Sequence, residues 1–335
     1  MSTSNGKTSL IRDNKVVNET MNVLYSQKNE TGDVTFVVES ESIRAHRNIL
    51  AAISPKYKAQ FYGAHADKGE IHVNDVSAAA FNEFLQFFYL NRVDLNTKNI
   101  EGVLNLAKQS LVDAFVTECI DFLMEVVNVD NLCWAYRLAI SYDIKKLKDH
   151  CEPQISANTK KVFASEDFIN CDHDLLIHIL KLDTMDCKET EVFDACIAWA
   201  KSIVRQEDMD SGDMEHLHAT LFDAITHIRF SSMTAEEFAE IHSKYKGFFT
   251  ADESCEIFYM IGKLKGYKSQ RFNQTPRNQT KKPLHNDQVK TAPVQQGHLQ
   301  AQSKNSAPIM TNQSVNIPFV REQIAMTRRR LLDLQ

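Results

Sequence analysis

The apolar and polar positions of the chain first follow the period of a β-strand. Residues 34–38 carry a two-residue alternation and are mostly β-branched or aromatic, which predicts a strand with one buried face. The polar stretch 39–42 is short enough for a hairpin turn, and residues 43–46 predict the return strand. The alternation recurs at 71–74, where we expect a third strand.

Most of the remaining chain up to residue 267 follows the helical period instead. Ser54 and Pro55 place a capping residue directly before a proline at the first helical position, which predicts a new helix there. Tyr57 and Phe61 lie four residues apart on that helix and therefore share one face. Further helical stripes are predicted over residues 17–25, 49–53, 81–89, 103–127 with a break near Ser110, and 132–142.

The composition changes beyond residue 267. Five of the seven prolines fall between Pro276 and Pro318, together with many Gln, Asn, Lys and Thr residues. Such a segment buries too little apolar surface to offset its ordering entropy, so we predict a disordered basic linker over 268–318. The polar residues 1–13 are also predicted to be disordered, and residues 319–335 to form a short amphipathic helix.

The net charge of −6 conceals an asymmetry between the body and the tail. Residues 268–335 contain eleven Lys and Arg and three Asp and Glu, so they carry +8 and the rest of the chain carries −14. An acidic body argues against nucleic-acid binding by the folded part. No apolar run approaches the length of a membrane span, so we expect no membrane insertion.

The cysteines and the polar N-terminus indicate an intracellular protein. All seven cysteines lie between Cys119 and Cys255, and no two of them form a C-x-x-C pair. Free, mostly buried thiols of a reducing compartment explain this pattern better than disulfides do. We therefore expect a cytoplasmic protein. Nuclear entry is an alternative that the basic residues 281–282 and 328–330 would direct.

Two parts of the sequence resemble known domains. Residues 32–63 read GDVTFVVESESIRAHRNILAAISPKYKAQFYG and resemble the BTB (POZ) domain in both the order of elements and the residues themselves. Residues 128–147 and the segment after them resemble the BACK domain, which follows BTB in many proteins. Residues 228–234 resemble a conserved motif near the end of BACK domains, with Ser231 at the position where proline is usual. The other specific echoes are Asp130-Asn131, Phe168, Glu189, Val192-Phe193 and Trp199.

The resemblance implies an α+β BTB/POZ domain, a small mixed sheet flanked by helices, over residues 14–127. An all-α BACK helical domain would follow over 128–267, and then the disordered tail. The whole is most similar to the BTBD group of cullin-3 adaptors, which carry BTB, BACK and a β-rich PHR domain. After residue 267 this sequence has neither a PHR-like run of strands nor kelch repeats.

The resemblance also implies a dimer. In dimerising BTB domains, a helix at the position of Val17, Met21 and Leu24 packs across the two-fold axis onto the partner; folding back onto its own domain is the alternative. Asp33 and Arg47 match positions that form a partly buried charged pocket near the dimer interface. Because a buried charge needs a partner, a purely structural ion pair between the two is the other reading.

Cullin-3 binding is the second implied interaction. Relatives that bind cullin-3 use an apolar residue followed two positions later by an acid, and residues 65–67 occupy that place. His65 replaces the usual apolar residue and buries less apolar area, whereas Asp67 retains the acid. The candidate cullin-binding residues are Tyr57, Phe61, His65, Asp67, Asn131 and Tyr142.

Catalytic signals are weak. Cys171 and His173 are neighbours in sequence, which does not establish the spatial pairing that a nucleophile needs. His216 and His218 lack further ligands at a recognisable metal spacing, and the ten glycines form no phosphate-binding loop. We therefore expect no enzymatic activity, no metal and no cofactor.

The sequence thus favours a dimeric BTB-BACK adaptor that recruits an unidentified protein substrate to a cullin-3 RING ubiquitin ligase for ubiquitination and proteasomal turnover. The alternative is a non-catalytic homo- or heterodimeric BTB scaffold that does not bind cullin. His65 is the residue on which the two hypotheses divide.

Overall fold

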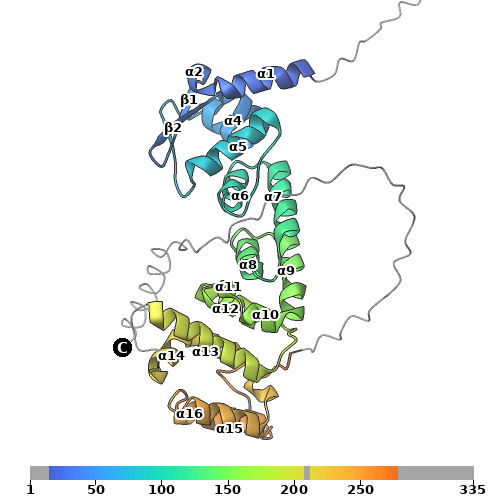
Figure 1. Ribbon diagram of the computed structural model, residues 1–335. Helices are drawn as coiled ribbons and strands as arrows, with labels where there is room; N and C mark the ends of the chain where they lie inside the picture. The colour runs from blue at the N-terminus through green and yellow to red at the C-terminus, as the bar shows by residue number, and fades with distance from the viewer. Residues whose placement is uncertain (1–14, 207–211, 278–335) are drawn as a thin grey trace, which may run out of the picture.

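A small three-stranded sheet organises the N-terminal domain of the computed structural model, which describes residues 15–206 and 212–277 (Figure 1). Strand β1 (Val34–Val38) lies between β2 (Glu41–Ala45), with which it is antiparallel, and β3 (Ile71–Val73), with which it is parallel. Every second residue of β1 is buried, as its alternation predicts. The predicted hairpin and third strand are therefore confirmed.

Helices cover this sheet and supply most of the core around the buried Phe36. The Phe36 ring lies 5.0 Å from that of Phe81 and 5.8 Å from that of Tyr57. Ser54 caps a helix as predicted, because its hydroxyl oxygen accepts the Tyr57 main-chain N–H at 3.2 Å. The helices of this domain are α1 (Lys15–Ser26), α2 (Lys28–Thr31), α3 (Arg47–Ile53), α4 (Pro55–Tyr62), α5 (Ala78–Leu90), α6 (Ile100–Gln109) and α7 (Asp113–Val126).

The regular elements of the second domain, over its described residues, are α-helices and 3₁₀ turns. Trp199 lies in its core, where the indole N–H donates to the main-chain oxygen of Cys171 at 2.9 Å. The elements are α8 (Leu132–Ser141), α9 (Lys145–Ala157), α10 (Thr159–Phe163), α11 (Glu166–Ile169), α12 (His173–Leu180), α13 (Glu189–Gln206), α14 (Met214–Leu221), α15 (Ala235–Lys244) and α16 (Ala251–Ile261), with 3₁₀ turns η1 (Phe222–His227) and η2 (Phe230–Ser232).

Polar side chains tie the two domains together where α6 and α7 meet α8 and α9. The Arg137 guanidinium of α8 pairs with Glu101 of α6 at 3.0 Å, and Lys146 of α9 pairs with Asp121 of α7 at 2.7 Å. The Lys108 ammonium also donates to the main-chain oxygen of Tyr142. These contacts accompany the packing of α7 against α9 along the long axis of the molecule (Figure 1).

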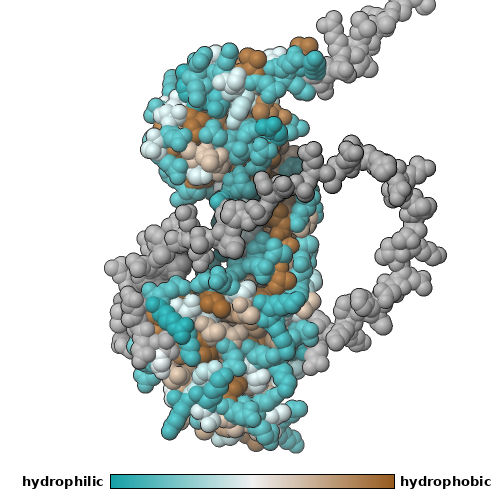
Figure 2. Space-filling view, viewed as in Figure 1, coloured by the Kyte–Doolittle hydropathy of each residue, from teal (hydrophilic) through white to brown (hydrophobic). Residues whose placement is uncertain are grey.

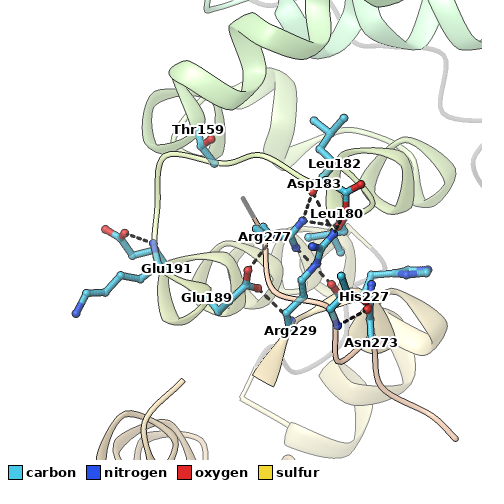
Figure 3. A network of polar contacts seen from close by, with 12 residues as sticks. Thr159, Leu180, Leu182, Asp183, Glu189, Glu191, His227, Arg229, Asn273 and Arg277 are labelled. Carbon is cyan, nitrogen blue, oxygen red and sulfur yellow. Dashed lines mark hydrogen bonds and ion pairs between the residues drawn. The ribbon is translucent and has the colours of Figure 1, made fainter. Parts of the chain in front are cut away.

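A network of buried charged residues holds residue 277 against the second domain (Figure 3). The folded domain therefore extends further along the chain than the sequence predicts. The Arg277 side chain is almost completely buried, and its Nε donates to Glu189 at 2.6 Å. The other Glu189 oxygen accepts the Arg229 main-chain N–H at 3.1 Å, while the Arg229 guanidinium pairs with Asp183 at 2.7 Å. Buried charges require partners of this kind.

The sequence placed the end of the folded body at residue 267, and this boundary is wrong for residues 268–277. Phe272 is buried against Phe230 at 5.3 Å, and the Asn273 main-chain N–H donates to the oxygen of Thr226 at 2.9 Å. Ser231, which stands where proline is usual, donates its hydroxyl to the Gln274 main-chain oxygen at 3.2 Å. The rest of the predicted linker and the predicted tail helix lie outside the described residues, as do residues 1–13.

Candidate protein-interaction surface

Asp33, Arg47 and Asp67, which the sequence assigns to two different interfaces, form one connected cluster. The Asp33 carboxylate accepts the Arg47 main-chain N–H at 2.7 Å and so satisfies an open donor at the start of α3. The Arg47 guanidinium donates to the main-chain oxygens of Asp33 at 3.1 Å and Asp67 at 2.8 Å, and lies 5.1 Å from the centre of the Phe61 ring. Arg47 therefore fixes the loop after α4 relative to the start of α3.

Within a single chain, Asp33 and Arg47 are joined through main-chain groups. Asp33 is exposed, and among the described contacts the Arg47 guanidinium binds main-chain oxygens and an aromatic ring, while the Asp33 carboxylate binds the Arg47 main-chain N–H. The Asp33 carboxylate holds the start of α3 through this hydrogen bond, and it does so at the surface. Within one chain the pair is thus a structural contact at the surface, and the charged pocket near the dimer interface stays a prediction.

Helix α1 divides its apolar residues between its own domain and solvent. Met21, Leu24 and Tyr25 are partly buried against the core, whereas Val17 is exposed although it continues the same helical stripe. The N-terminal half of α1 extends beyond the rest of the domain, and hydrophobic surface lies at its end (Figures 1 and 2). The C-terminal half of α1 therefore packs onto its own domain and the N-terminal half keeps an exposed apolar surface, whose packing onto a partner stays a prediction.

Tyr57 and Phe61 are core residues, so their assignment as cullin-binding candidates is wrong. Only 3% of the Tyr57 surface is exposed, and its ring stacks on that of Phe61 at 5.4 Å. The same helix instead presents Tyr62, which is 60% exposed. Burial of α4 against α5 and the sheet determines this choice, because Tyr62 follows Phe61 in sequence but points about 100° away around the helix.

An open hollow adjoins Tyr62. It has a volume of about 640 Å³ and is lined by the facing residues of α3 and α4, among them Ala51, Ile53 and Lys58. Ile53 and Tyr62 are exposed beside the hollow. Leu111 is also exposed, and it directly follows Ser110, whose main-chain oxygen accepts the Ser54 hydroxyl at 2.6 Å. We call the three residues Ile53, Tyr62 and Leu111 the α4 face. Sequence spacing did not identify it.

The other cullin-binding candidates lie at the surface or between the domains. His65 and Asp67 are exposed, and Gln60 Nε2 donates to the Asp67 carboxylate at 2.9 Å. Asn131 precedes α8, where its side-chain oxygen accepts the Asn128 main-chain N–H at 2.7 Å. Tyr142 is partly buried at the end of α8, and burial raises the pKa of its hydroxyl.

The cysteine and histidines that the sequence singled out make structural contacts. Cys171 is buried and burial raises its thiol pKa, which opposes thiolate formation. His173 faces Asp223 at 3.5 Å, and His216 binds the Asp213 carboxylate that caps α14. Over residues 15–206 and 212–277, no group of three or more His, Cys, Asp or Glu residues is placed to hold a metal ion. Nor does any helix there have the length and apolarity to cross a bilayer.

Comparison with known proteins assigns both domains. A model of the BTB/POZ domain matches residues 21–126, and a model described as BTB And C-terminal Kelch, the BACK domain, matches residues 132–243. The chain therefore belongs to the BTB-BACK proteins, with a BTB/POZ fold followed by a helical BACK domain. Both predicted domains are confirmed by these matches.

The similar curated proteins are BTB/POZ domain-containing proteins, in agreement with the BTBD group. Protein 6-A of Danio rerio is 30% identical over 242 residues, which cover 71% of this chain and 44% of that protein. Protein 6 of Homo sapiens is 29% identical over 267 residues, covering 75% and 49%. The chain spans just under half the length of these relatives. Among solved structures, the BTB domain of human gigaxonin is 24% identical with a TM-score of 0.30, covering 35% of this chain and 98% of that one.

Proposed function

We propose that this protein is a dimeric adaptor that recruits a protein substrate to a cullin-3 RING ubiquitin ligase and thereby promotes ubiquitination and proteasomal turnover. The observation that carries the proposal is the α4 face, whose residues Ile53, Tyr62 and Leu111 are exposed. Tyr62 directly precedes the loop that contains His65 and Asp67. Exposed apolar residues grouped in this way are typical of protein-binding surfaces.

The energetics of the α4 face suit a partner with an apolar surface. Tyr62 and Leu111 are each 60% exposed, and burying a large apolar side chain contributes roughly 1.5–3 kcal/mol. Asp67 adds an acid whose loop is held by Arg47 and Gln60, so little conformational entropy would be lost when a partner binds. His65 adds less apolar area than the residue usual in cullin-binding relatives.

The exposed N-terminal half of α1 would form the dimer interface. Val16, Val17 and Val23 are exposed on this helix, and a second copy related by two-fold symmetry would cover them. An adaptor of this kind forms and breaks no covalent bonds. It raises the local concentration of a substrate lysine near the conjugating enzyme.

The decisive experiment measures binding of the cullin-3 N-terminal region to the full chain by calorimetry. We expect Tyr62→Ala and Leu111→Ala each to weaken binding about tenfold, since each removes on the order of 1.4 kcal/mol. His65→Met should strengthen it. Phe222→Ala, an exposed aromatic in the BACK domain, serves as the matched control and should leave affinity unchanged. Absence of binding by both the wild type and His65→Met would contradict the ligase proposal.

The second candidate is a dimeric scaffold that pairs with itself or other BTB domains without binding cullin. His65 favours this alternative, because an imidazole placed in an apolar contact must satisfy its ring N–H groups. Under this alternative Val17→Glu would alter assembly, while wild type and Tyr62→Ala alike would fail to bind cullin.

We also propose a cytoplasmic location, with nuclear entry directed by basic residues at 281–282 and 328–330 as the alternative. A reporter fused to residues 268–335 separates the two. Cytoplasmic retention of that reporter would exclude nuclear targeting by this segment.

A further inference from the structure

A groove lies at the end of the BACK domain, where α15 and α16 are farthest from α1 (Figure 1). Its volume is about 950 Å³, and it runs between the C-terminal end of α16, the turn that follows, and η2. Gln274 and Pro276 also line it, so the segment that Arg277 anchors forms part of the wall. The groove is thus built from three segments that the fold holds in place.

Aromatic side chains are held half-exposed along one wall. Phe258 and Tyr259 are 44% and 48% exposed, although both belong to the same helix turn. The Phe258 ring packs edge-on against Phe238 at 5.0 Å, and the Tyr259 ring packs against Tyr267 at 5.5 Å. Aromatic residues fixed in this way can bury apolar area against a partner at a low entropy cost.

The turn after α16 adds an apolar residue between two lysines. The Leu264 main-chain N–H donates to the oxygen of Tyr259 at 3.1 Å, and Lys263 adopts a left-handed conformation with φ of +49°. This is the Schellman arrangement that ends a helix, and it holds Leu264 close to Tyr259. Leu264 is exposed, and Lys263 and Lys265 on either side of it also line the groove.

The charge of the groove is opposite to that of the body around it. Lys263 and Lys265 are its charged lining residues, and no acidic side chain contributes to the lining from the described part of the chain. Residues 1–267 carry a net charge of −14, so a positive groove on this body would select for acidic partners.

We propose that this groove binds an acidic peptide segment of a partner protein, in which an aromatic or aliphatic residue is flanked by Asp or Glu. The apolar residue would contact Phe258, Tyr259 and Leu264, and the flanking carboxylates would pair with Lys263 and Lys265. The chain's own residues 278–335 are disfavoured as the occupant, because they contain eight Lys and Arg and three acids and would meet like charge.

The groove gives the adaptor a place for its substrate. This assignment of the peptide as a substrate rests on the proposed function, whereas the binding of the peptide does not. The groove lies at the far end of the molecule from the BTB domain, so a peptide bound there would leave the α4 face free for cullin.

The test presents the full chain, without cullin, to an array of 12-residue peptides. Their cores vary among Leu, Ile, Met, Phe, Tyr and Trp, and their flanks are Asp/Glu, Lys or Ser. We expect binders to be enriched among the acid-flanked peptides. The strongest is then measured by fluorescence anisotropy, where Lys263→Glu with Lys265→Glu should weaken binding at least tenfold and Tyr259→Ser should do the same.

The matched control is Lys98→Glu with Lys145→Glu, which makes the same charge change at exposed positions outside the groove and should alter affinity less than twofold. Equal binding of the three flank types, or an equal loss in the control, would overturn the proposal. Hydrogen-exchange protection of residues 319–334 that Tyr259→Ser abolishes would make the chain's own tail the occupant. Self-association that the groove variants abolish would make it a second copy, and either result overturns the proposal. Cullin binding is measured separately, so its failure remains distinguishable.

Discussion

At the scale of single residues, carboxylates hold helix ends and buried arginines in this chain. Asp33 accepts the first main-chain N–H of α3, and Asp172 accepts one at the start of α12. Glu189 bridges Arg229 and Arg277 inside the BACK domain. Because each of these groups has one or two defined partners, single substitutions test their contributions.

Arg277→Ala should destabilise the BACK domain by about 3–5 kcal/mol, because it leaves Glu189 buried with its guanidinium partner removed. It also removes donors to the main-chain oxygens of Leu180 and His227. The measurement is urea unfolding followed by circular dichroism. Arg92→Ala removes an exposed arginine that pairs with Asp94, and should cost less than about 1 kcal/mol. A loss for Arg277→Ala as small as that of the control would contradict the anchoring role.

The ionised Glu253 carboxylate should make a pH-dependent contribution to the free energy of unfolding. Burial by itself would raise its pKa, but the Thr250 main-chain N–H, His218 and the Thr250 hydroxyl hold the pKa below its ordinary value of 4.5. Its stabilisation is therefore present above about pH 4.5 and lost as the pH falls through the lower pKa of the folded state.

Glu253→Gln should accordingly lower the urea midpoint most at neutral pH, and the difference in midpoint from wild type should narrow as the pH falls below 4.5. Glu236→Gln removes the same charge from an exposed position of α15 and controls for net charge. A gap that stays constant from pH 6 to pH 3 would argue against the linkage.

At the scale of elements, α1 and the segment 268–277 are the parts whose conformation depends most on contacts with the rest of the fold. A 12-residue helix is marginal by itself in water, so α1 depends on the packing of its C-terminal half against the domain. Residues 268–277 contain few apolar side chains, yet Phe272 and Arg277 attach them firmly to the BACK domain.

Val17→Glu should weaken dimerisation at least tenfold, because it places a charge in an interface that we expect to be apolar. Analytical ultracentrifugation of the full chain measures the dissociation constant. Asn22→Glu introduces the same charge on the polar side of the same helix and should leave the constant nearly unchanged. A wild-type chain that stays monomeric at micromolar concentration would contradict the dimer.

At the scale of the whole molecule, side-chain contacts link the BTB domain to the BACK domain. Glu101 and Arg137 join α6 to α8, while Lys108 reaches the end of α8. These contacts would make the BTB domain and the BACK groove move as one unit, so the distance between cullin and a bound peptide would be fixed.

Removing these contacts should uncouple the domains. Wild type is expected to unfold in one calorimetric transition, and Lys108→Ala with Arg137→Ala to separate it into two transitions a few degrees apart. Lys15→Ala with Lys188→Ala removes two exposed ion pairs that lie within single domains, and should preserve the single transition. Two transitions in the wild type would show that the domains are already independent.

The sequence by itself determined the elements whose cause is local. The alternation over residues 34–38 predicts β1, and Ser54 with Pro55 predicts the start of α4, because strand period and helix capping involve only a few neighbouring residues. The BTB and BACK domains could likewise be predicted, because long stretches of the sequence resemble those two families.

Only the tertiary structure decided which side chains face outward and where the fold ends. Phe61 and Tyr62 are both aromatic, and it is packing against α5 and the sheet that buries the first and exposes the second. Arg277 belongs to the folded body because Glu189, 88 residues earlier, meets it there. Burial and long-range ion pairing depend on what the rest of the chain places nearby, and no local pattern contains that information.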